Sequence, residues 1–210
     1  MRVGFIGAGN VGKTIARHLI SAGHEVVISN SKGPESLEGI VGELGPLARA
    51  ATKEEAVRCD LIILCVHWLH AQEALKGITW NGQILVDATN AHIGNPPDIS
   101  LEGVTKSRAA LSKTGRTSSE LVAEWAPGAR VVKSISNMPM AWIQDFSSHK
   151  PKTVIFTSGD DSEAKKIVID LIDSVGFVAI DLGSLAKGGA MHQVGAPLSG
   201  LDLHFVRRLR

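Results

Sequence analysis

The stretch R2-V3-G4-F5-I6-G7-A8-G9-N10-V11-G12-K13-T14-I15-A16-R17-H18-L19-I20-S21-A22-G23-H24-E25-V26-V27-I28 decides the fold of this chain. It opens with an apolar run typical of a buried strand, continues into a glycine-rich turn, and then places Val11, Ile15 and Leu19 at helical spacing. A glycine ends the helical pattern before a second apolar run, Val26 to Ile28. The stretch therefore predicts a strand, a helix and a strand within about thirty residues, which is the unit of a parallel sheet.

The same alternation of strands and helices continues along the chain. After residue 28, apolar runs predict strands over residues 47–50, 61–66, 84–87, 130–134, 153–157 and 178–181. Helical patterns fall between them, over residues 36–44, 53–58, 70–76, 118–125 and 160–175, and a polar stretch spans residues 91–116. We therefore predict an α/β protein with a doubly wound parallel sheet, the Rossmann architecture, covered by helices on both faces.

The end of the chain suggests a smaller unit. The alternation restarts at residue 151, and its first strand could extend the same sheet. From Gly183 onward the sequence mixes glycine-rich loop with a last segment, residues 198–209, whose apolar residues fit a helix. We expect a Rossmann domain over residues 1–150 and a small C-terminal α/β subdomain over residues 151–210.

Composition excludes several classes of protein. The 210 residues are 44% apolar and 20% charged with a formal net charge of +1, which is typical of a globular protein and gives no broad basic surface for nucleic acid. The longest apolar run, Leu61 to Val66, is too short to cross a membrane, so we expect a cytoplasmic protein without a membrane partner. The chain has no tyrosine, which excludes the nicotinamide enzymes that use a Tyr-x-x-x-Lys pair as proton donor.

The first turn has the pattern of a dinucleotide-binding loop. Glycines occupy its first, third and sixth positions, as Gly7, Gly9 and Gly12, and Asn10 and Val11 precede the last of them. In such loops the glycines allow a tight turn, close approach of the backbone to a pyrophosphate, and close packing of helix on strand. The helix N-terminus adds unpaired N–H groups and partial positive charge. These five residues are therefore predicted to bind the pyrophosphate of a dinucleotide.

The turn after the second strand predicts which dinucleotide binds. NAD-binding sites commonly carry an acid there, which accepts hydrogen bonds from the ribose hydroxyls and would repel a 2′-phosphate. This chain has Ser29, Asn30, Ser31 and Lys32 instead, which can donate to phosphate oxygens and add a positive charge. The same residue types also make an ordinary solvated turn. With the glycine loop beside them, they favour NADP(H) as the cofactor.

Several segments together resemble a known family. They are MRVGFIGAGNVGKTIARHL, SNSKGPESL, LCVHWLHAQEAL, VDATN, VVKSISNMP and PLSGLDLHFVRRL, and they cover nearly the whole chain. The chain resembles the NADPH-dependent reductases of the deazaflavin coenzyme F420, a family that also includes bacterial relatives of unassigned substrate and the cytoplasmic reductase part of membrane ferric reductases. The resemblance implies hydride transfer between NADP(H) and a flat, flavin-like ring, with F420 or a flavin as co-substrate and a homodimer as the assembly.

The resemblance also implies roles for particular residues. Ser29, Asn30 and Lys32 would hold the 2′-phosphate. Two segments after the fourth and fifth strands would flank the nicotinamide ribose: Val66, His67, Trp68, Ala88, Thr89 and Asn90. The chain departs from the family in two places, because arginine is frequent where Lys32 stands and proline is usual where His67 stands.

The chemistry of the acceptor stays open at this stage. Ring-to-ring hydride transfer needs alignment more than an acid or base. Reduction of a small carbonyl or imine would need a proton donor, for which His67 is the candidate catalytic residue because histidine titrates near neutrality. Thr89, Ser136 and Asn137 could orient such a small-molecule substrate. A non-catalytic NADP-binding sensor is the third hypothesis.

Three other groups invite functional readings that we do not favour. His67 and His70 could share a helix face, but no third ligand is identifiable, so no metal site is expected. Trp142, Ile143 and Phe146, after Met138-Pro139-Met140, could form an apolar surface that faces a flavin, although core packing or a subunit contact is the commoner role of such residues. The arginines among residues 207–210 could meet an anionic substrate tail, although a basic helix end is the simpler interpretation.

Overall fold

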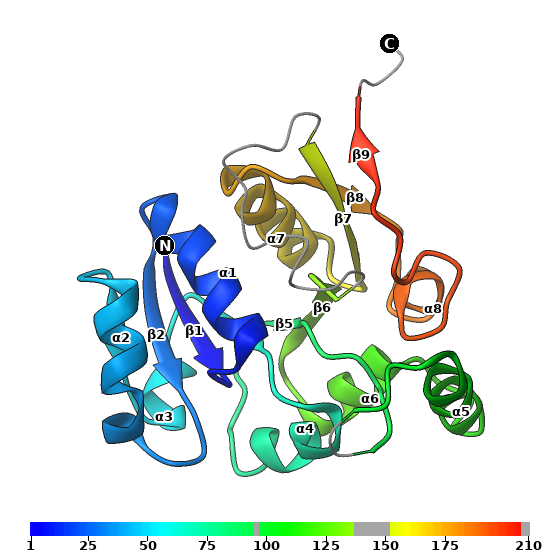
Figure 1. Cartoon of the computed structure of the whole chain (residues 1–210), viewed down its shortest axis with the longest axis horizontal. Helices are drawn as coiled ribbons and strands as arrows, with labels where there is room; N and C mark the ends of the chain where they lie inside the picture. The colour runs from blue at the N-terminus through cyan, green and yellow to red at the C-terminus, as the bar shows by residue number, and fades with distance from the viewer. Residues whose placement is uncertain (95–96, 137–151, 207–210) are drawn as a thin grey trace.

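Strands from both halves of the chain join into one sheet with helices on both faces (Figure 1). The computed structural model describes residues 1–94, 97–136 and 152–206. The strands are β1 (Arg2–Ile6), β2 (Glu25–Ser29), β3 (Ala48–Ala50), β4 (Leu61–Leu64), β5 (Ile84–Asp87), β6 (Arg130–Ser134), β7 (Lys152–Gly159), β8 (Val178–Asp181) and β9 (His204–Phe205). The helices are α1 (Asn10–Ser21), η1 (Pro34–Leu37), α2 (Glu38–Leu44), α3 (Lys53–Ala56), α4 (Trp68–Leu75), α5 (Leu101–Ser112), α6 (Ser118–Trp125), α7 (Ser162–Ser174) and α8 (Gly189–His192).

The strand order creates a switch point at the middle of the sheet. The order is β3-β2-β1-β4-β5-β6-β7-β8, and β9 pairs with β7 off this path. The pairs from β3 to β6 are all parallel, so the chain moves one way from β1 to β2 and the other way to β4. In such sheets ligands bind in the crevice outside the carboxyl ends of the strands at this point. The predicted doubly wound Rossmann fold is confirmed.

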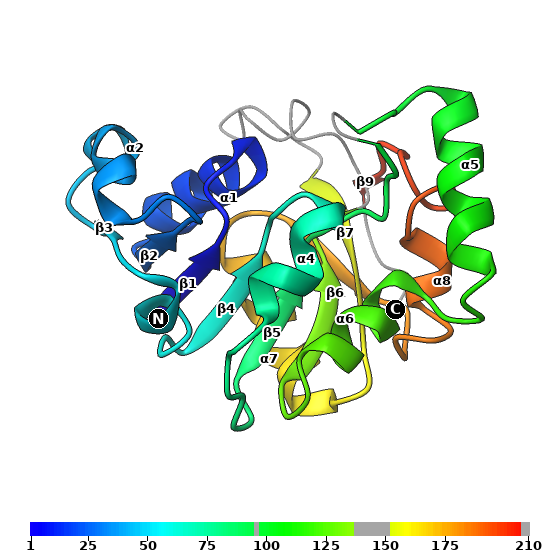
Figure 2. The ribbon, with the colours of Figure 1, turned by 90° about the horizontal axis from the view of Figure 1, so that it is seen from below.

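Alternating side chains of the strands form a separate core on each face of the sheet. On one face, Phe5 and Ile63 pack with apolar residues of α1, α2 and α7. On the other face, Ile62 and Leu64 pack with residues of α4 and α6. Figure 2 shows α4 and α6 on the near side of β5 and β6, with α7 behind the sheet. The central strands are buried on both faces, as their continuous apolar runs predict.

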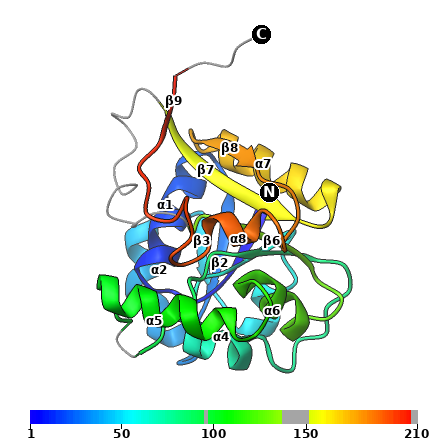
Figure 3. The ribbon, with the colours of Figure 1, turned by 90° about the vertical axis from the view of Figure 1, so that its right-hand side faces the viewer.

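The sequence predicted a parallel sheet, but the sheet is not parallel throughout, because β7 runs opposite to its neighbour β6. It runs antiparallel to β6 and parallel to β8, so β7, α7 and β8 form a second strand-helix-strand unit of opposite direction in the same sheet. In Figure 3, β7, α7 and β8 lie on one side of α8, and α5 and α6 lie on its opposite side. Whether residues 151–210 fold as a unit of their own depends on their separate stability, so the proposed boundary at residue 150 stays a prediction.

The helix expected over residues 198–209 is wrong for the residues that the structure describes there. Residues 201–206 contain no helical residue, and His204 and Phe205 pair with Thr153 and Lys152. The partner β6 reaches only the other end of β7, at residues 157–159, so the first residues of β7 have an open edge. Pairing there satisfies backbone groups that a short terminal helix would leave to water.

Two helices were not foreseen in the sequence, and one was foreseen differently. The polar stretch at residues 91–116 contains α5, whose N-cap Ser100 accepts a hydrogen bond from the N–H of Gly103. Its buried face carries Gly103, Ser107 and Leu111, which gives almost no apolar periodicity. The short α8 was also missed. The helix expected over residues 36–44 begins instead as the 3₁₀ turn η1, with Pro34 at its start.

Candidate functional site

The glycine loop leaves open space at one position only. A Cβ built on Gly7, whose φ is +114°, would lie 2.6 Å from the carbonyl oxygen of Cys65. A Cβ on Gly12 would lie 2.8 Å from the carbonyl oxygen of Gly7, whereas a Cβ on Gly9 would meet no atom within 4 Å. The protein's own packing therefore requires the first and last glycines. The space beside Gly9 is free for a ligand to approach the backbone.

Helix α1 begins without a cap at this open space. Its N-cap residue Gly9 makes no side-chain hydrogen bond, and its first turn contains no acid. By contrast, Thr52 and Thr117 complete capping boxes at α3 and α6, and Ser100 and Asp161 cap α5 and α7. An uncapped N-terminus presents unpaired N–H groups and partial positive charge, which suit a phosphate. The loop that contains Asn10 and Val11 thus fits the pyrophosphate of a dinucleotide.

The turn after β2 is stiffened by its own hydrogen bonds. The side-chain oxygen of Asn30 accepts the N–H of Lys32 at 2.9 Å, and its Nδ2 donates to Ser36 Oγ at 2.8 Å. Ser29 is buried, and its hydroxyl donates to the carbonyl oxygen of Phe5 at 2.7 Å. Ser31 and Lys32 are exposed. Among the residues that the structure describes, the exposed side chains of Ser31 and Lys32 have no hydrogen-bond partner, so they are donors of this turn that an anion could use, and Asn30 holds the turn in place.

A cleft of about 550 Å³ joins the glycine loop to this turn. That volume is within the range of small-molecule sites. Besides Gly7, Gly9 and residues 29–31, its lining includes residues that the sequence analysis did not assign to the cofactor: Ala8, Lys53, Cys65, His70, Glu73 and Ala74. His70 and Ala74 are four residues apart on α4, so they share a helix face. That spacing, directly after the carboxyl end of a parallel strand, is the signal that could have found them.

Two of these additional lining residues, Lys53 and Cys65, also have partners inside the protein. Lys53 Nζ donates to the carbonyl oxygen of Lys76 at 2.9 Å. The Cys65 thiol donates to the carbonyl oxygen of Gly7 at 3.2 Å, and burial raises its pKa to about 12. Cys65 therefore supports the glycine loop as a neutral thiol and is no nucleophile.

His67 caps α4 with its imidazole ring. Nδ1 accepts the N–H of Leu69 at 3.3 Å, so the proton of the neutral ring is on Nε2. Nε2 is buried and has no hydrogen-bond partner in the described part of the chain. Burial, and then the neighbouring His70, lower the pKa of His67. The ring therefore offers one N–H donor near neutral pH. Of its predicted neighbours, Val66 lines the cleft, whereas Trp68 packs on Trp125 with ring centroids 5.1 Å apart.

The exit of β5 is tied to a buried ion pair. Asp87 and Lys133 are both fully buried, with Nζ 3.7 Å from Oδ2. Asp87 Oδ1 accepts the N–H and the hydroxyl of Thr89 at 2.9 and 2.6 Å, and Lys133 Nζ donates to the carbonyl oxygen of Thr89 at 3.2 Å. Burial lowers the pKa of Lys133, while the Asp87 carboxylate opposes that shift. Thr89 thus spends its polar groups internally and Ala88 is buried. Asn90 donates from Nδ2 to the carbonyl oxygen of Ser136 at 2.7 Å, and none of these three predicted residues lines the cleft.

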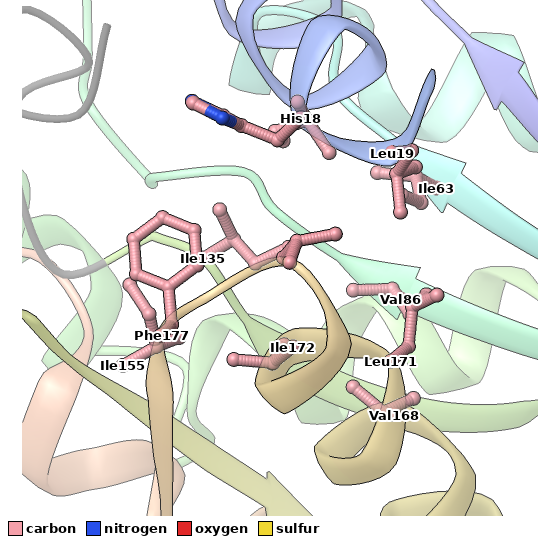
Figure 4. Close-up of a pocket in the computed structure, with 12 residues that line it drawn as sticks. His18, Leu19, Ile63, Val86, Ile135, Ile155, Val168, Leu171, Ile172 and Phe177 are labelled. Atoms are coloured by element: carbon pink, nitrogen blue, oxygen red, sulfur yellow. The ribbon is translucent and has the colours of Figure 1, made fainter. Parts of the chain in front are cut away.

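A second, more enclosed space is an apolar cavity of about 20 Å³ between α1 and α7 (Figure 4). Leu19 and Ile63 face Leu171 and Ile172 across it, and His18 and Phe177 meet edge to face at one side. A bound water needs two to four polar partners, and this lining is apolar apart from His18. The cavity is therefore a packing gap among apolar side chains, with His18 as the one polar side chain in the lining.

Within residues 1–94, 97–136 and 152–206 there is no cluster of three metal-ligating side chains and no helix that could span a membrane. Asn137, residues 138–146 and the arginines of residues 207–210 lie outside the described residues.

Comparisons with known proteins agree with the geometry. Residues 2–91 match the family model described as NADP oxidoreductase, coenzyme F420-dependent. A crystal structure of a hypothetical protein from Sinorhizobium meliloti is 33% identical, with a TM-score of 0.84, over 98% of this chain and 96% of that one.

Two characterised relatives are more distant. The F420-dependent NADP reductase of Methanocaldococcus jannaschii is 27% identical over 73% of this chain and 66% of its own length. The metalloreductase STEAP3 of Rattus norvegicus is 27% identical over 89% of this chain, which spans 34% of that protein. Residues 2–91 thus match the family of coenzyme F420-dependent NADP oxidoreductases, and relatives of the chain are similar to it over most of its length.

Proposed function

We propose that this chain binds NADPH and transfers hydride between NADP(H) and a flavin-like acceptor, for which the family suggests coenzyme F420. The carrying observation is the uncapped N-terminus of α1 beside open space at Gly9, next to a stiff turn that presents Ser31 and Lys32. The cleft is lined by Gly9 and Ser31, and the exposed Lys32 follows Ser31 in the turn. NADPH has two separate anionic parts that would match these two places, its pyrophosphate and its 2′-phosphate.

The residues of the site bind and orient rather than exchange protons. When bound, NADPH supplies the hydride. Gly7, Gly9 and Gly12 let the backbone N–H groups of α1 hold the pyrophosphate, and Lys32 meets the 2′-phosphate. His67 lines the cleft, and its Nε2–H is the donor of this side chain without a partner among the described residues. Alignment of two rings at near-contact distance is the main requirement of such a transfer.

A turnover assay tests the acceptor. NADPH oxidation is followed by absorbance with F420, FMN, FAD and a panel of small carbonyls and imines. We expect turnover with F420 or a flavin, and little loss of rate in His67→Asn, which keeps a neutral side-chain donor. A carbonyl or imine reductase would instead show a pH-dependent rate that His67→Asn removes. Binding of NADPH without turnover of any acceptor would favour the sensor hypothesis.

We further propose that the protein acts as a homodimer. Three large apolar side chains are strongly exposed in the monomer, Ile99 at 76%, Leu101 at 85% and Val206 at 79%. Burial in a subunit contact would remove this apolar surface from water. Light scattering of the purified protein should give twice the mass of one chain, and a monomeric mass would refute this proposal. The cytoplasmic location stays a prediction.

A further inference from the structure

The cleft extends beyond the glycine loop and the turn after β2. Its other side, which we call the α3–α4 side, is lined by Lys53 at the start of α3 and by His70, Glu73 and Ala74 of α4. None of these four residues belongs to the two places that the phosphate groups of NADP(H) would occupy. The α3–α4 side therefore has room for another part of the ligand.

The adenine base is the part of the cofactor that can reach the α3–α4 side. In NADP(H) this base is bonded to the ribose that carries the 2′-phosphate, so it lies within one sugar of the turn after β2. Strand β3, which leads into α3, pairs in parallel with β2, so its carboxyl end opens beside that turn. The nicotinamide end leaves the glycine loop in the other direction, toward β5. The α3–α4 side is thus the place for the base.

Helix α4 offers a surface for one face of a flat base. His70 and Ala74 are four residues apart, so their side chains share a face of α4, and both line the cleft. Contacts with a ring and a methyl group hold any flat base. Selection among bases therefore depends on the charged side chains of the α3–α4 side, Lys53 and Glu73.

Lys53 and Glu73 place a donor and an acceptor at the same end of the cleft. Lys53 Nζ donates to the carbonyl oxygen of Lys76 at 2.9 Å, which uses one of its three N–H groups. Glu73 Oε2 lies 3.6 Å from Nζ of the same Lys76. Both side chains are therefore tied to the residue that ends α4, and each keeps hydrogen-bonding capacity for a ligand.

A donor beside an acceptor complements the edge of adenine. That edge carries the ring nitrogen N1, which accepts, next to the 6-amino group, which donates. We propose that the cleft selects adenine over other purine bases, with Lys53 Nζ donating to N1 and Glu73 accepting from the 6-amino group. Hypoxanthine presents the reverse pattern, because its N1 carries a proton and its position 6 carries an oxo group. This inference rests on the proposed NADP(H) binding.

Calorimetry of the full chain with two ligands tests this selection. NADP⁺ is compared with nicotinamide hypoxanthine dinucleotide phosphate, which keeps the nicotinamide, the pyrophosphate and the 2′-phosphate and differs only in the base. Wild-type protein should bind the hypoxanthine ligand about tenfold more weakly, because that ligand faces Lys53 with a donor and Glu73 with an acceptor. This comparison needs no variant, so it stands even if a substitution disturbs folding.

Two variants separate the two contacts, and each should lower the affinity ratio of the ligands from about ten to about three. Glu73→Gln should tighten binding of the hypoxanthine ligand, because an amide can also donate to an oxo group. Lys53→Met should weaken NADP⁺, because it removes the donor and keeps the length of the side chain. Glu54→Gln is the matched control: it removes an acid of α3 beside Lys53 that does not line the cleft, and both affinities should stay unchanged.

Specific results would overturn the proposal. Equal wild-type affinity for the two ligands would do so, as would a ratio that stays at the wild-type value in either variant. A Lys53→Met variant that weakens both ligands alike but leaves NAD⁺ unchanged would assign Lys53 to the 2′-phosphate instead, and an equal loss for all three would assign it to the pyrophosphate. Protein that binds neither NADP⁺ nor the hypoxanthine ligand would refute the proposed function, whereas equal binding of both leaves that function intact.

Discussion

Two strand-helix-strand units of this molecule share a geometry but not a helix start. The β1-α1-β2 unit and the β7-α7-β8 unit each join two parallel strands through a helix, of 12 residues in α1 and 13 in α7. Both helices bury apolar residues in the same core cluster. However, α7 starts at Asp161, whose carboxylate accepts the N–H of Ala164 at 2.7 Å, and Glu163 follows in its first turn. Helix α1 starts at Gly9 with neither.

The difference separates what the fold provides from what a ligand site needs. Any helix N-terminus has unpaired N–H groups and partial positive charge. In α7 the Asp161 carboxylate accepts one of these N–H groups, and its charge would also repel a phosphate. In α1 they stay available beside the space at Gly9. Helices α2 and α8 also begin without a side-chain cap, but neither contributes to the cleft lining. We infer that α1 is the cofactor end of the molecule, while α7 supports the sheet.

The largest expected effect comes from making α1 resemble α7. In Gly9→Asp, the added carboxylate caps the helix and occupies the space of the pyrophosphate, so NADPH affinity should fall by about a hundredfold or more. The Tm should not fall, because a Cβ at Gly9 meets no atom within 4 Å. Calorimetry and thermal unfolding measure the two quantities. NADPH affinity equal to that of the wild type would contradict the comparison.

A second difference concerns the loss of folding stability at acid pH, to which a buried histidine packed against β7 should contribute. His192 Nε2 pairs with Ser158 Oγ of β7 at 2.9 Å, and burial, and then the charge of Lys133, lower the pKa of His192 to about 3. The unfolded chain, with a histidine pKa of 6.5, binds the extra proton between these values, so stability falls as pH drops from 6.5 toward 3.

Replacing this histidine should flatten the pH dependence. In His192→Gln, the free energy of unfolding should fall less steeply below pH 6.5, by about 1.4 kcal/mol per pH unit for one proton. Urea unfolding at pH 7, 6 and 5 measures the slopes. The pKa values of His67 and His92 are also lowered by burial, but they contribute equally to both proteins. Identical slopes would show that His192 carries no share of the acid response.

The turn after β2 gives the next smaller effect. Lys32→Ala removes the charge for the 2′-phosphate, and Ser29→Asp adds the acid common in NAD sites. The double variant should lose about tenfold of its preference for NADPH over NADH, since a charge-assisted hydrogen bond contributes about 1.5–3 kcal/mol. Because the Ser29 hydroxyl bonds Phe5 inside the fold, Lys32→Ala alone is the cleaner variant. Competitive titrations with both cofactors would detect an unchanged ratio, which would refute the role of this turn.

Uncapping α7 should have the smallest effect. Asp161→Ala removes the side-chain acceptor for the Ala164 N–H and should lower the free energy of unfolding by about 1 kcal/mol. NADPH affinity should not change, because the α7 start is no part of the cleft. Chemical unfolding and calorimetry of the same sample check both statements. A loss of cofactor affinity here would show that the two units are not separate in function.

Local patterns carried the predictions that the structure confirms. The β1-α1-β2 unit follows from apolar periodicity and its glycine turn, and the bounds of β5, α6, β6 and β8 agree with the sequence pattern. The helix expected over residues 198–209 fails because pairing with β7 is a long-range contact that apolar spacing does not encode. Helix α5 was missed because small and polar residues such as Gly103 and Ser107 fill its buried face.

The site was predictable to a similar degree. The glycine loop and the polar turn are each one continuous segment of sequence. They lie close together in the structure because they follow β1 and β2, which pair in parallel. The inward hydrogen bond of Ser29, the tautomer of His67 and the pairing of Asn90 with Ser136 depend on partners that only the folded chain brings together. Lys53 enters the cleft from a third strand end for the same reason. The roles of these residues in binding remain predictions.

The most direct measurement is a calorimetric titration of the wild-type protein and Gly9→Asp with NADPH and NADH. The account predicts one NADPH per chain, tighter binding of NADPH than of NADH, and loss of both in a variant that still unfolds at the wild-type Tm. Wild-type protein that released no heat with NADPH, or that bound both cofactors equally, would contradict it.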